Sequence, residues 1–117
     1  MIEDLIAFQK LEDLTILLNV TLSKIPKNEQ FVLTQNIKNE LYHIVRLVIH
    51  LNNLKSNKQE HQLEVCEEFD FLFYLVRIAY KSKYIPMKQY ENISTKINEI
   101  IKICYGWMKN THSENKI

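Results

Sequence analysis

Residues 65–79 read VCEEFDFLFYLVRIA, and their apolar side chains recur every three or four positions. This spacing places the side chains along a helix, because a half-buried strand would alternate apolar and polar residues. The helix predicted over residues 59–81 has an inward stripe of Val65, Phe69, Leu72, Phe73, Val76 and Ala79. A second stripe points away from the first and contains Phe71, Leu75 and Ile78, with Tyr74 beside it. This helix therefore carries two apolar faces.

Three further segments show the same helical spacing. Helices are predicted over residues 4–25, over residues 28–54, and from Pro86 onward. Their inward stripes are Ala7, Leu11, Leu14, Leu18, Leu22 and Ile25 in the first, Ile37, Leu41, Ile44, Val48 and Leu51 in the second, and Tyr90, Ile93, Ile97, Ile101, Cys104 and Met108 in the last. The first helix also has a second stripe, in which Leu5, Ile16 and Val20 lie nearly opposite its inward residues.

Few residues interrupt these helices, since the chain has a single glycine and two prolines. Pro26 ends the first helix, because proline disfavours helical geometry in the residue before it. Asn28 is then expected to cap the second helix, and Pro86 fits the first turn of the fourth. Four helices of similar length with short connections predict an all-α, antiparallel up-down-up-down four-helix bundle.

The bundle is expected to occupy residues 1–110 as one domain of the 117-residue chain. The tail, residues 111–117, has no apolar stripe and is expected to fray. Glu3 and Asp4 stand where a signal peptide would carry Lys or Arg. The longest apolar stretch, residues 41–51, is shorter than the roughly 20 residues that a membrane-spanning helix needs. We therefore expect a cytoplasmic protein with no membrane partner.

Patterns that would indicate catalysis or metal binding are weak. Phosphate-binding loops and hydrolase turns need at least two spaced glycines, and the chain has one. Glu40 and His43 have the spacing found in di-iron bundles, but such sites need that step twice, so we interpret both as part of a solvated face. Arg46 and His50 are closer together than the arginine and histidine of helical ribonucleases. The sequence thus predicts no enzyme, no metal and no cofactor.

Both cysteines, Cys66 and Cys104, fall at apolar helix positions and lack a metal-binding spacing. We interpret them as small core residues. A disulfide between them requires that their two helices meet, and a cytosolic setting argues against one.

The second apolar stripes predict self-association, because a repeated stripe of this kind usually marks a contact surface. The residues expected to join copies of the chain are Ile16, Val20, Phe71, Leu75 and Ile78.

Charge is nearly balanced, with 15 Lys and Arg against 14 Asp and Glu, so any surface that binds nucleic acid must be local. Five basic residues on the last two helices and their connection could merge into one patch that meets phosphates: Arg77, Lys81, Lys83, Lys88 and Lys102. Repeated around a ring of subunits, this patch would become a continuous basic track.

Three motifs give the chain a resemblance to a known family. They are residues 25–31 (IPKNEQF), residues 86–90 (PMKQY), and residues 105–109 (YGWMK). In this order they resemble the four-helix-bundle family of the accessory variability determinant (Avd) of diversity-generating retroelements and of proteins encoded by rRNA intervening sequences. Phe73 and Gln30 stand where that family often carries arginines, and Ile85 replaces its usual helix-four cap residue.

The resemblance implies a homopentameric ring without enzymatic activity that binds RNA or DNA and the reverse transcriptase of the retroelement. In this role the protein would support mutagenic copying of a template repeat. An alternative stays open, in which the chain is an oligomeric protein-interaction bundle of the intervening-sequence type with no nucleic-acid role.

Overall fold

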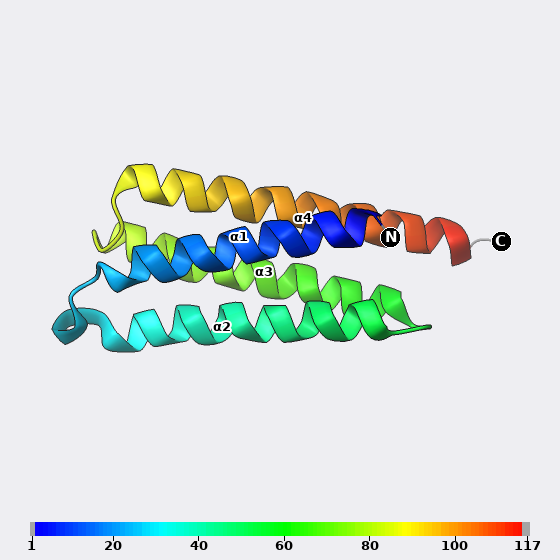
Figure 1. The fold of residues 1–117 in the computed structure, drawn as a ribbon, viewed down its shortest axis with the longest axis horizontal. Helices are drawn as coiled ribbons and strands as arrows, with labels where there is room; N and C mark the ends of the chain where they lie inside the picture. Colours follow the sequence, from blue (N-terminus) through cyan, green and yellow to red (C-terminus); the bar gives the residue numbers. More distant parts are fainter. Residues whose placement is uncertain (1, 116–117) are drawn as a thin grey trace.

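The computed structural model describes the backbone of residues 2–115 and the side chains of residues 6–26 and 31–107. The described chain forms four helices, which are α1 (Ile2–Ser23), α2 (Lys27–Asn53), α3 (Lys58–Lys81) and α4 (Met87–Asn115). Consecutive helices run in opposite directions along a molecule of 54 × 22 × 20 Å (Figure 1). The predicted up-down-up-down bundle is therefore confirmed.

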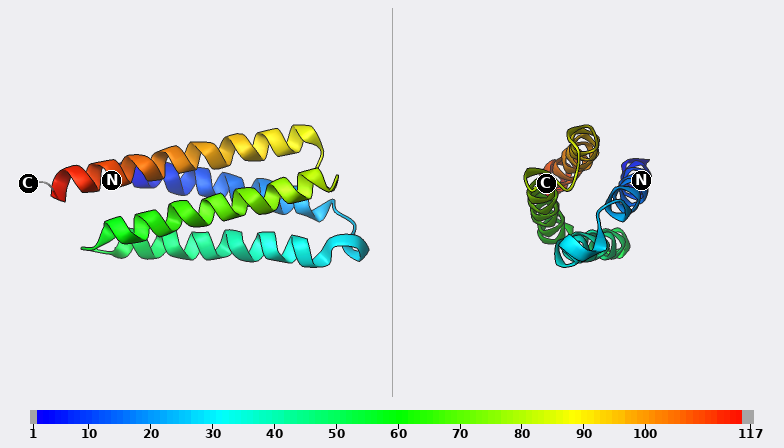
Figure 2. Two further views of the ribbon diagram at one scale, coloured as in Figure 1. Left: turned by 180° about the vertical axis from the view of Figure 1, so that it is seen from behind. Right: turned by 90° about the vertical axis from the view of Figure 1, so that its left-hand side faces the viewer.

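The four helices stand at the corners of a square when the bundle is seen along its length (Figure 2). Each helix packs against its two neighbours around the square, so that α1 and α3 are diagonally opposite. The connections after α1 and after α3 lie at one end of the bundle, and the connection after α2 lies at the other end.

The core is built from the stripes that the helical spacing predicts. Every residue of the predicted inward stripes of α1 and α2 is buried. In α3 the stripe is buried as predicted except for Phe73, which is half-buried because it faces Tyr90 at the edge of the α3–α4 contact.

The inward stripe of α4 differs from the predicted one. Tyr90 and Ile101 are only half-buried, whereas Ile100 and Trp107 are buried. Four residues turn a helix by about 40° beyond one full turn. A stripe whose residues follow one another at intervals of four therefore rotates out of the core. An interval of three residues brings the stripe back toward the core. The side chain of Met108, which was also expected in this stripe, lies outside the described residues.

One helix boundary corrects a further expectation. Helix α2 begins at Lys27, directly after Pro26, so Asn28 lies inside the first turn and is not the capping residue. Helix α4 continues to Asn115, so most of the tail has helical backbone, and the expected fraying of the tail stays a prediction. Residues 116 and 117 lie outside the described part of the chain.

Helix α3 ends in a tightly hydrogen-bonded turn. The backbone N–H of Lys83 donates to the carbonyl of Tyr80, and that of Tyr84 donates to the carbonyl of Ala79, each at 2.9 Å. This pair of bonds is the Schellman motif, whose penultimate residue adopts the left-handed conformation and is usually glycine. Here that residue is Lys83, with a φ of 70°.

Because glycine adopts this conformation without a side-chain clash, Lys83→Gly is expected to raise the free energy of unfolding by up to about 1 kcal/mol. Asn57 also has a positive φ, of 60°, and provides a matched control. Asparagine tolerates the left-handed region better than lysine, so Asn57→Gly should give a smaller gain. Urea denaturation of both variants measures the difference. A lower stability of Lys83→Gly would mean that the lysine side chain contributes more than its strained backbone costs.

Candidate functional site

Four of the five predicted basic residues follow one another through the end of α3, the connection and the start of α4. These residues are Arg77, Lys81, Lys83 and Lys88, and all four side chains are exposed. Lys24, which the sequence analysis overlooked, is exposed in the α1–α2 connection at the same end of the bundle (Figure 1). We call these five residues the basic end.

Lys102, the fifth predicted basic residue, lies apart from the basic end. It is exposed on α4, 14 residues beyond Lys88, which corresponds to about 21 Å along a helix. Its charge acts on Glu99, a carboxylate that accepts a hydrogen bond of 2.9 Å from Lys10 of α1. This hydrogen bond, reinforced by the charges of Lys10, Lys96 and Lys102, lowers the pKa of Glu99. The structure therefore does not join Lys102 to the predicted patch.

Aromatic contacts fix the helices that carry the basic end. The rings of Tyr80 on α3 and Tyr90 on α4 stack with centroids 4.3 Å apart and planes 7° from parallel. The ring of Phe73 meets that of Tyr90 edge-on at 6.3 Å. Stacked and edge-on pairs of this kind add specific geometry to apolar burial. The ends of α3 and α4 are thus held at a fixed spacing beside the exposed cations.

Charge is separated along α3. Its first 13 residues carry five acidic residues together with Lys58, and its last five carry Arg77 and Lys81; the acidic residues are Glu60, Glu64, Glu67, Glu68 and Asp70. This order complements the helix dipole. Electrostatic screening acts over about 8 Å at physiological salt, and Asp70, the nearest of these carboxylates along the helix, is seven residues before Arg77, roughly 10 Å. The acidic half therefore does not cancel the potential of the basic end, and the small net charge conceals it.

Two exposed apolar faces lie on opposite sides of the bundle. On α1, Ile16 is 57% exposed and Val20 is exposed beside it. On α3, Phe71 is 48% exposed, and Tyr74 and Ile78 are exposed about one and two turns further along. We call these the α1 face and the α3 face. Since α1 and α3 are diagonally opposite, one bundle presents the two faces in opposite directions (Figure 2).

Leu75 corrects the predicted interface. The sequence analysis grouped it with Phe71 and Ile78, but Leu75 is half-buried against the core. Its position on α3 turns it toward the contact with α2, whereas Phe71 and Ile78 lie further round the helix. Leu75 therefore supports the core beneath the α3 face.

The contact between α2 and α3 contains ionisable residues that the sequence analysis assigned to a solvated face. Glu40 is half-buried, and burial raises its pKa to about 8, helped by a hydrogen bond with Glu68 and by the charge of Glu68. His43 Nε2 lies 4.0 Å from Glu68 Oε1. Further along, the rings of His50 and His61 meet edge-on at 5.2 Å. Only the pairing of α2 with α3 brings these residues together, so no pattern within one helix could have found them.

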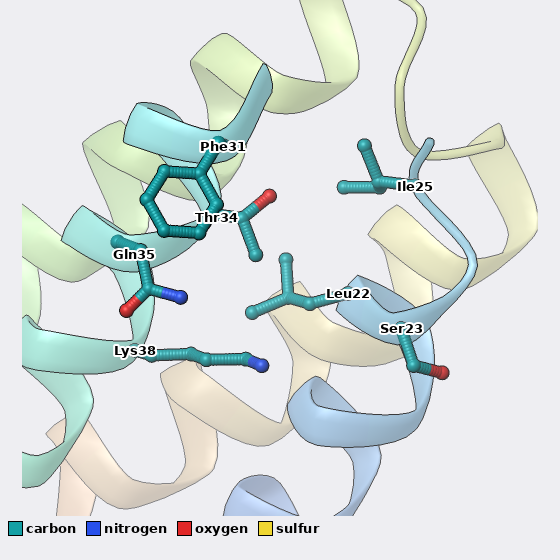
Figure 3. Close-up of a pocket in the computed structure, with 7 residues that line it drawn as sticks. All are labelled: Leu22, Ser23, Ile25, Phe31, Thr34, Gln35 and Lys38. Carbon is teal, nitrogen blue, oxygen red and sulfur yellow. The ribbon is translucent and has the colours of Figure 1, made fainter. Parts of the chain in front are cut away.

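A hollow of about 320 Å³ lies between the end of α1 and the start of α2 (Figure 3). Its described lining is Leu22, Ser23, Ile25, Phe31, Thr34, Gln35 and Lys38. Leu22 and Ile25 are buried, whereas the Phe31 ring is exposed at the edge. None of these lining residues is acidic, and Lys38 adds a cation. The hollow therefore continues the positive character of this end of the molecule.

Two further features, a metal site and a membrane-spanning helix, are absent from the described residues. No group of three or more His, Cys, Asp or Glu side chains there is placed to hold a metal ion. No helix in that part of the chain is apolar over the length that a bilayer crossing requires.

Titration of Glu40 should make the stability of the bundle depend on pH. Burial raises the pKa of Glu40 to about 8 in the folded protein, whereas the ordinary pKa of a glutamate carboxyl is 4.5. Stability should therefore fall as the pH rises from about 4.5 toward about 8 and level off above it, because the unfolded chain releases the proton first. Glu40→Gln should flatten this dependence, and Glu67→Gln, at an exposed position of α3, should leave it unchanged. Urea denaturation across this pH range measures the dependence. The assignment would be contradicted if the free energy of unfolding of both variants kept the wild-type slope against pH.

Comparison with known proteins agrees with the architecture. The sequence model of a family described as bAvd-like matches residues 5–111, which include α2, α3, most of α1 and α4, and the basic end. Among curated proteins, no match to the chain is found. A match over nearly the whole described bundle is sufficient to assign the family, and the chain belongs to the bAvd-like family.

Proposed function

We propose that this protein is a non-enzymatic accessory protein of a diversity-generating retroelement. Its copies join into a ring through the α1 face and the α3 face, and the basic ends of the ring bind nucleic acid together with the reverse transcriptase. The observation that carries the proposal is the exposed basic end, whose cations take part in none of the ion pairs found within the described residues. Membership of the bAvd-like family supports the same role.

The placement of the two apolar faces favours a ring over a simple dimer. Two identical surfaces that meet each other give a closed pair, whereas two different surfaces on opposite sides give head-to-tail contact. The α1 face of one copy would meet the α3 face of the next, and a constant rotation between copies closes the ring. The resemblance to Avd implies five copies. A monomer leaves Phe71 and Ile16 exposed to water, and contact between copies would bury them.

Ring symmetry would strengthen the basic end. In a cyclic assembly every copy points the same way along the ring axis, so all α3–α4 connections gather on one side. The cations of neighbouring copies then act on the same phosphates, which a single bundle with a net charge of +1 cannot do alone. Binding of this kind neutralises phosphates without reading base edges, so we expect little dependence on sequence.

Lys83 gives a specific indication that the basic end is used. Its left-handed backbone would be better accommodated by glycine, and lysine there costs about 1 kcal/mol. A residue held in a disfavoured conformation is a reason to look for function at that position. The Lys83 side chain is exposed at this turn, where a phosphate can reach it.

A second function is favoured by a different observation. The resemblance to Avd places Phe73 where that family often carries an arginine, and here the Phe73 side chain is half-buried against Tyr90. A chain that has an apolar side chain instead of a charged one at this position could keep the ring of subunits. It could then serve as an oligomeric protein-interaction bundle that binds no nucleic acid. Salt dependence separates the two functions, because apolar association is nearly indifferent to screening.

Nucleic-acid binding should be strongly salt-dependent. Contacts from Arg77, Lys81, Lys83 and Lys88 predict an affinity loss on the order of 100-fold between roughly 50 and 200 mM salt. Arg77→Glu should abolish measurable binding of labelled RNA or DNA at moderate salt. The control is Lys55→Glu, the same charge change at an exposed position of the opposite end. Fluorescence anisotropy measures the binding affinity. An equal loss of affinity in both variants, or an affinity that does not change with salt, would favour the protein-interaction function instead.

Self-association should depend on the α3 face. Light scattering of the wild-type protein is expected to give a mass several times the 14.0 kDa of one chain. Phe71→Glu places a charge in every proposed contact and should reduce the mass to that of a single chain. Ile49→Glu is the matched control, because Ile49 on α2 is also 48% exposed but lies on neither face. A single-chain mass for the wild type at high concentration would exclude the ring.

A further inference from the structure

Cys66 of α3 and Cys104 of α4 meet inside the bundle. Both side chains are buried, at 1% and 0% exposure. Their thiols hydrogen bond to one another across the two helices, and no disulfide joins them. The sequence analysis made a bond between them conditional on contact between their helices, and α3 and α4 form the most extensive helix contact in the bundle.

We propose that Cys66 and Cys104 form a redox-modification site, at which a low-molecular-weight disulfide such as oxidised glutathione converts the two thiols to an intramolecular disulfide between α3 and α4. The register of the two helices is the observation that carries this proposal. Tyr80 stacks on Tyr90 at 4.3 Å, and positions 66 and 104 each lie 14 residues further along antiparallel, packed helices, so the two buried cysteines stand at the same level of the core. A disulfide requires the two sulfurs to approach to about 2.05 Å with their Cα atoms within roughly 7 Å, a geometry that facing positions on packed helices can reach by side-chain rotation.

The two cysteines have different roles in the reaction. The hydrogen bond from Cys104 lowers the pKa of the Cys66 thiol, whereas the same bond and burial raise the pKa of the Cys104 thiol. Since the thiolate is the nucleophile, Cys66 is the residue that attacks first. Cys104 then acts as the resolving thiol.

The exchange is balanced in atoms and electrons. The Cys66 thiolate attacks one sulfur of the small disulfide, forms a mixed disulfide and releases one small thiolate. Cys104 gives its proton to that thiolate, and its own sulfur then attacks Cys66 Sγ and displaces the second small thiolate. The second small thiolate takes up the proton that Cys66 released on ionising, so two protein thiols are oxidised to one disulfide and one small disulfide is reduced to two small thiols.

Burial determines how fast this happens. An oxidant the size of glutathione reaches the thiols only when the contact between α3 and α4 opens transiently. Oxidation should therefore be slow in the native protein and faster in mild denaturant. The disulfide would then cross-link the two helices that carry most of the basic end, and the closed loop between positions 66 and 104 should raise the melting temperature by on the order of 10 °C.

The experiment treats the full-length protein with oxidised glutathione, with and without mild urea, and follows intact mass, free thiols and melting temperature. The wild-type protein should lose the mass of two hydrogen atoms and both free thiols, and it should melt at a higher temperature than the reduced protein. Removing the urea afterwards should reverse none of these changes. Cys104→Ala should stop at a single glutathione adduct, and Cys66→Ala should react more slowly than Cys104→Ala. Peptide mapping of the oxidised wild type places the bond directly, so the test holds even if a variant folds poorly.

Three outcomes would overturn the proposal. The first is a wild-type protein that keeps both thiols under conditions in which its denatured chain is oxidised. The second is accumulation of glutathione adducts on both cysteines without closure. The third is a disulfide that joins two copies of the chain.

Discussion

The bundle depends on the limited space at its centre, where each helix can bury only one stripe of apolar side chains. Phe69 and Phe71 illustrate the consequence, since the two residues are about 200° apart around α3, and only Phe69 is buried. Once four inward stripes fill the core, the second stripes of α1 and α3 have no place inside. The same packing that stabilises one chain thus leaves two apolar faces on opposite sides, and the proposed ring follows from that surplus.

The direction of the chain then decides where charge collects. Because α1 and α3 run parallel, their connections to the next helix share one end, and the lysines of both connections gather there (Figure 1). The stacked rings of Tyr80 and Tyr90 hold that end in shape. A chain with a net charge of +1 can therefore present a local positive surface, while the acidic first half of α3 lies toward the other end of the molecule.

Helical spacing was sufficient to predict most of the fold, because in α1 and α2 the single inward stripe of each helix already identifies the residues that are buried. It misplaced the stripe at Ile101 and the interface at Leu75, where the orientation of a neighbouring helix decides which borderline position turns inward. Features that need two helices were beyond it. The carboxyl pair of Glu40 and Glu68 and the contact of Cys66 with Cys104 depend on helix pairing and register, which no single stripe encodes.

The central claim is that the α1 face of one copy meets the α3 face of the next, and mixing two complementary variants tests it most directly. One variant carries Ile16→Glu and Val20→Glu, and the other carries Phe71→Glu, so each keeps one face intact. Native mass spectrometry should find each variant alone as a single chain and an equimolar mixture as a dimer of one copy of each. A variant that pairs with itself, or a mixture that stays as single chains, would contradict head-to-tail assembly.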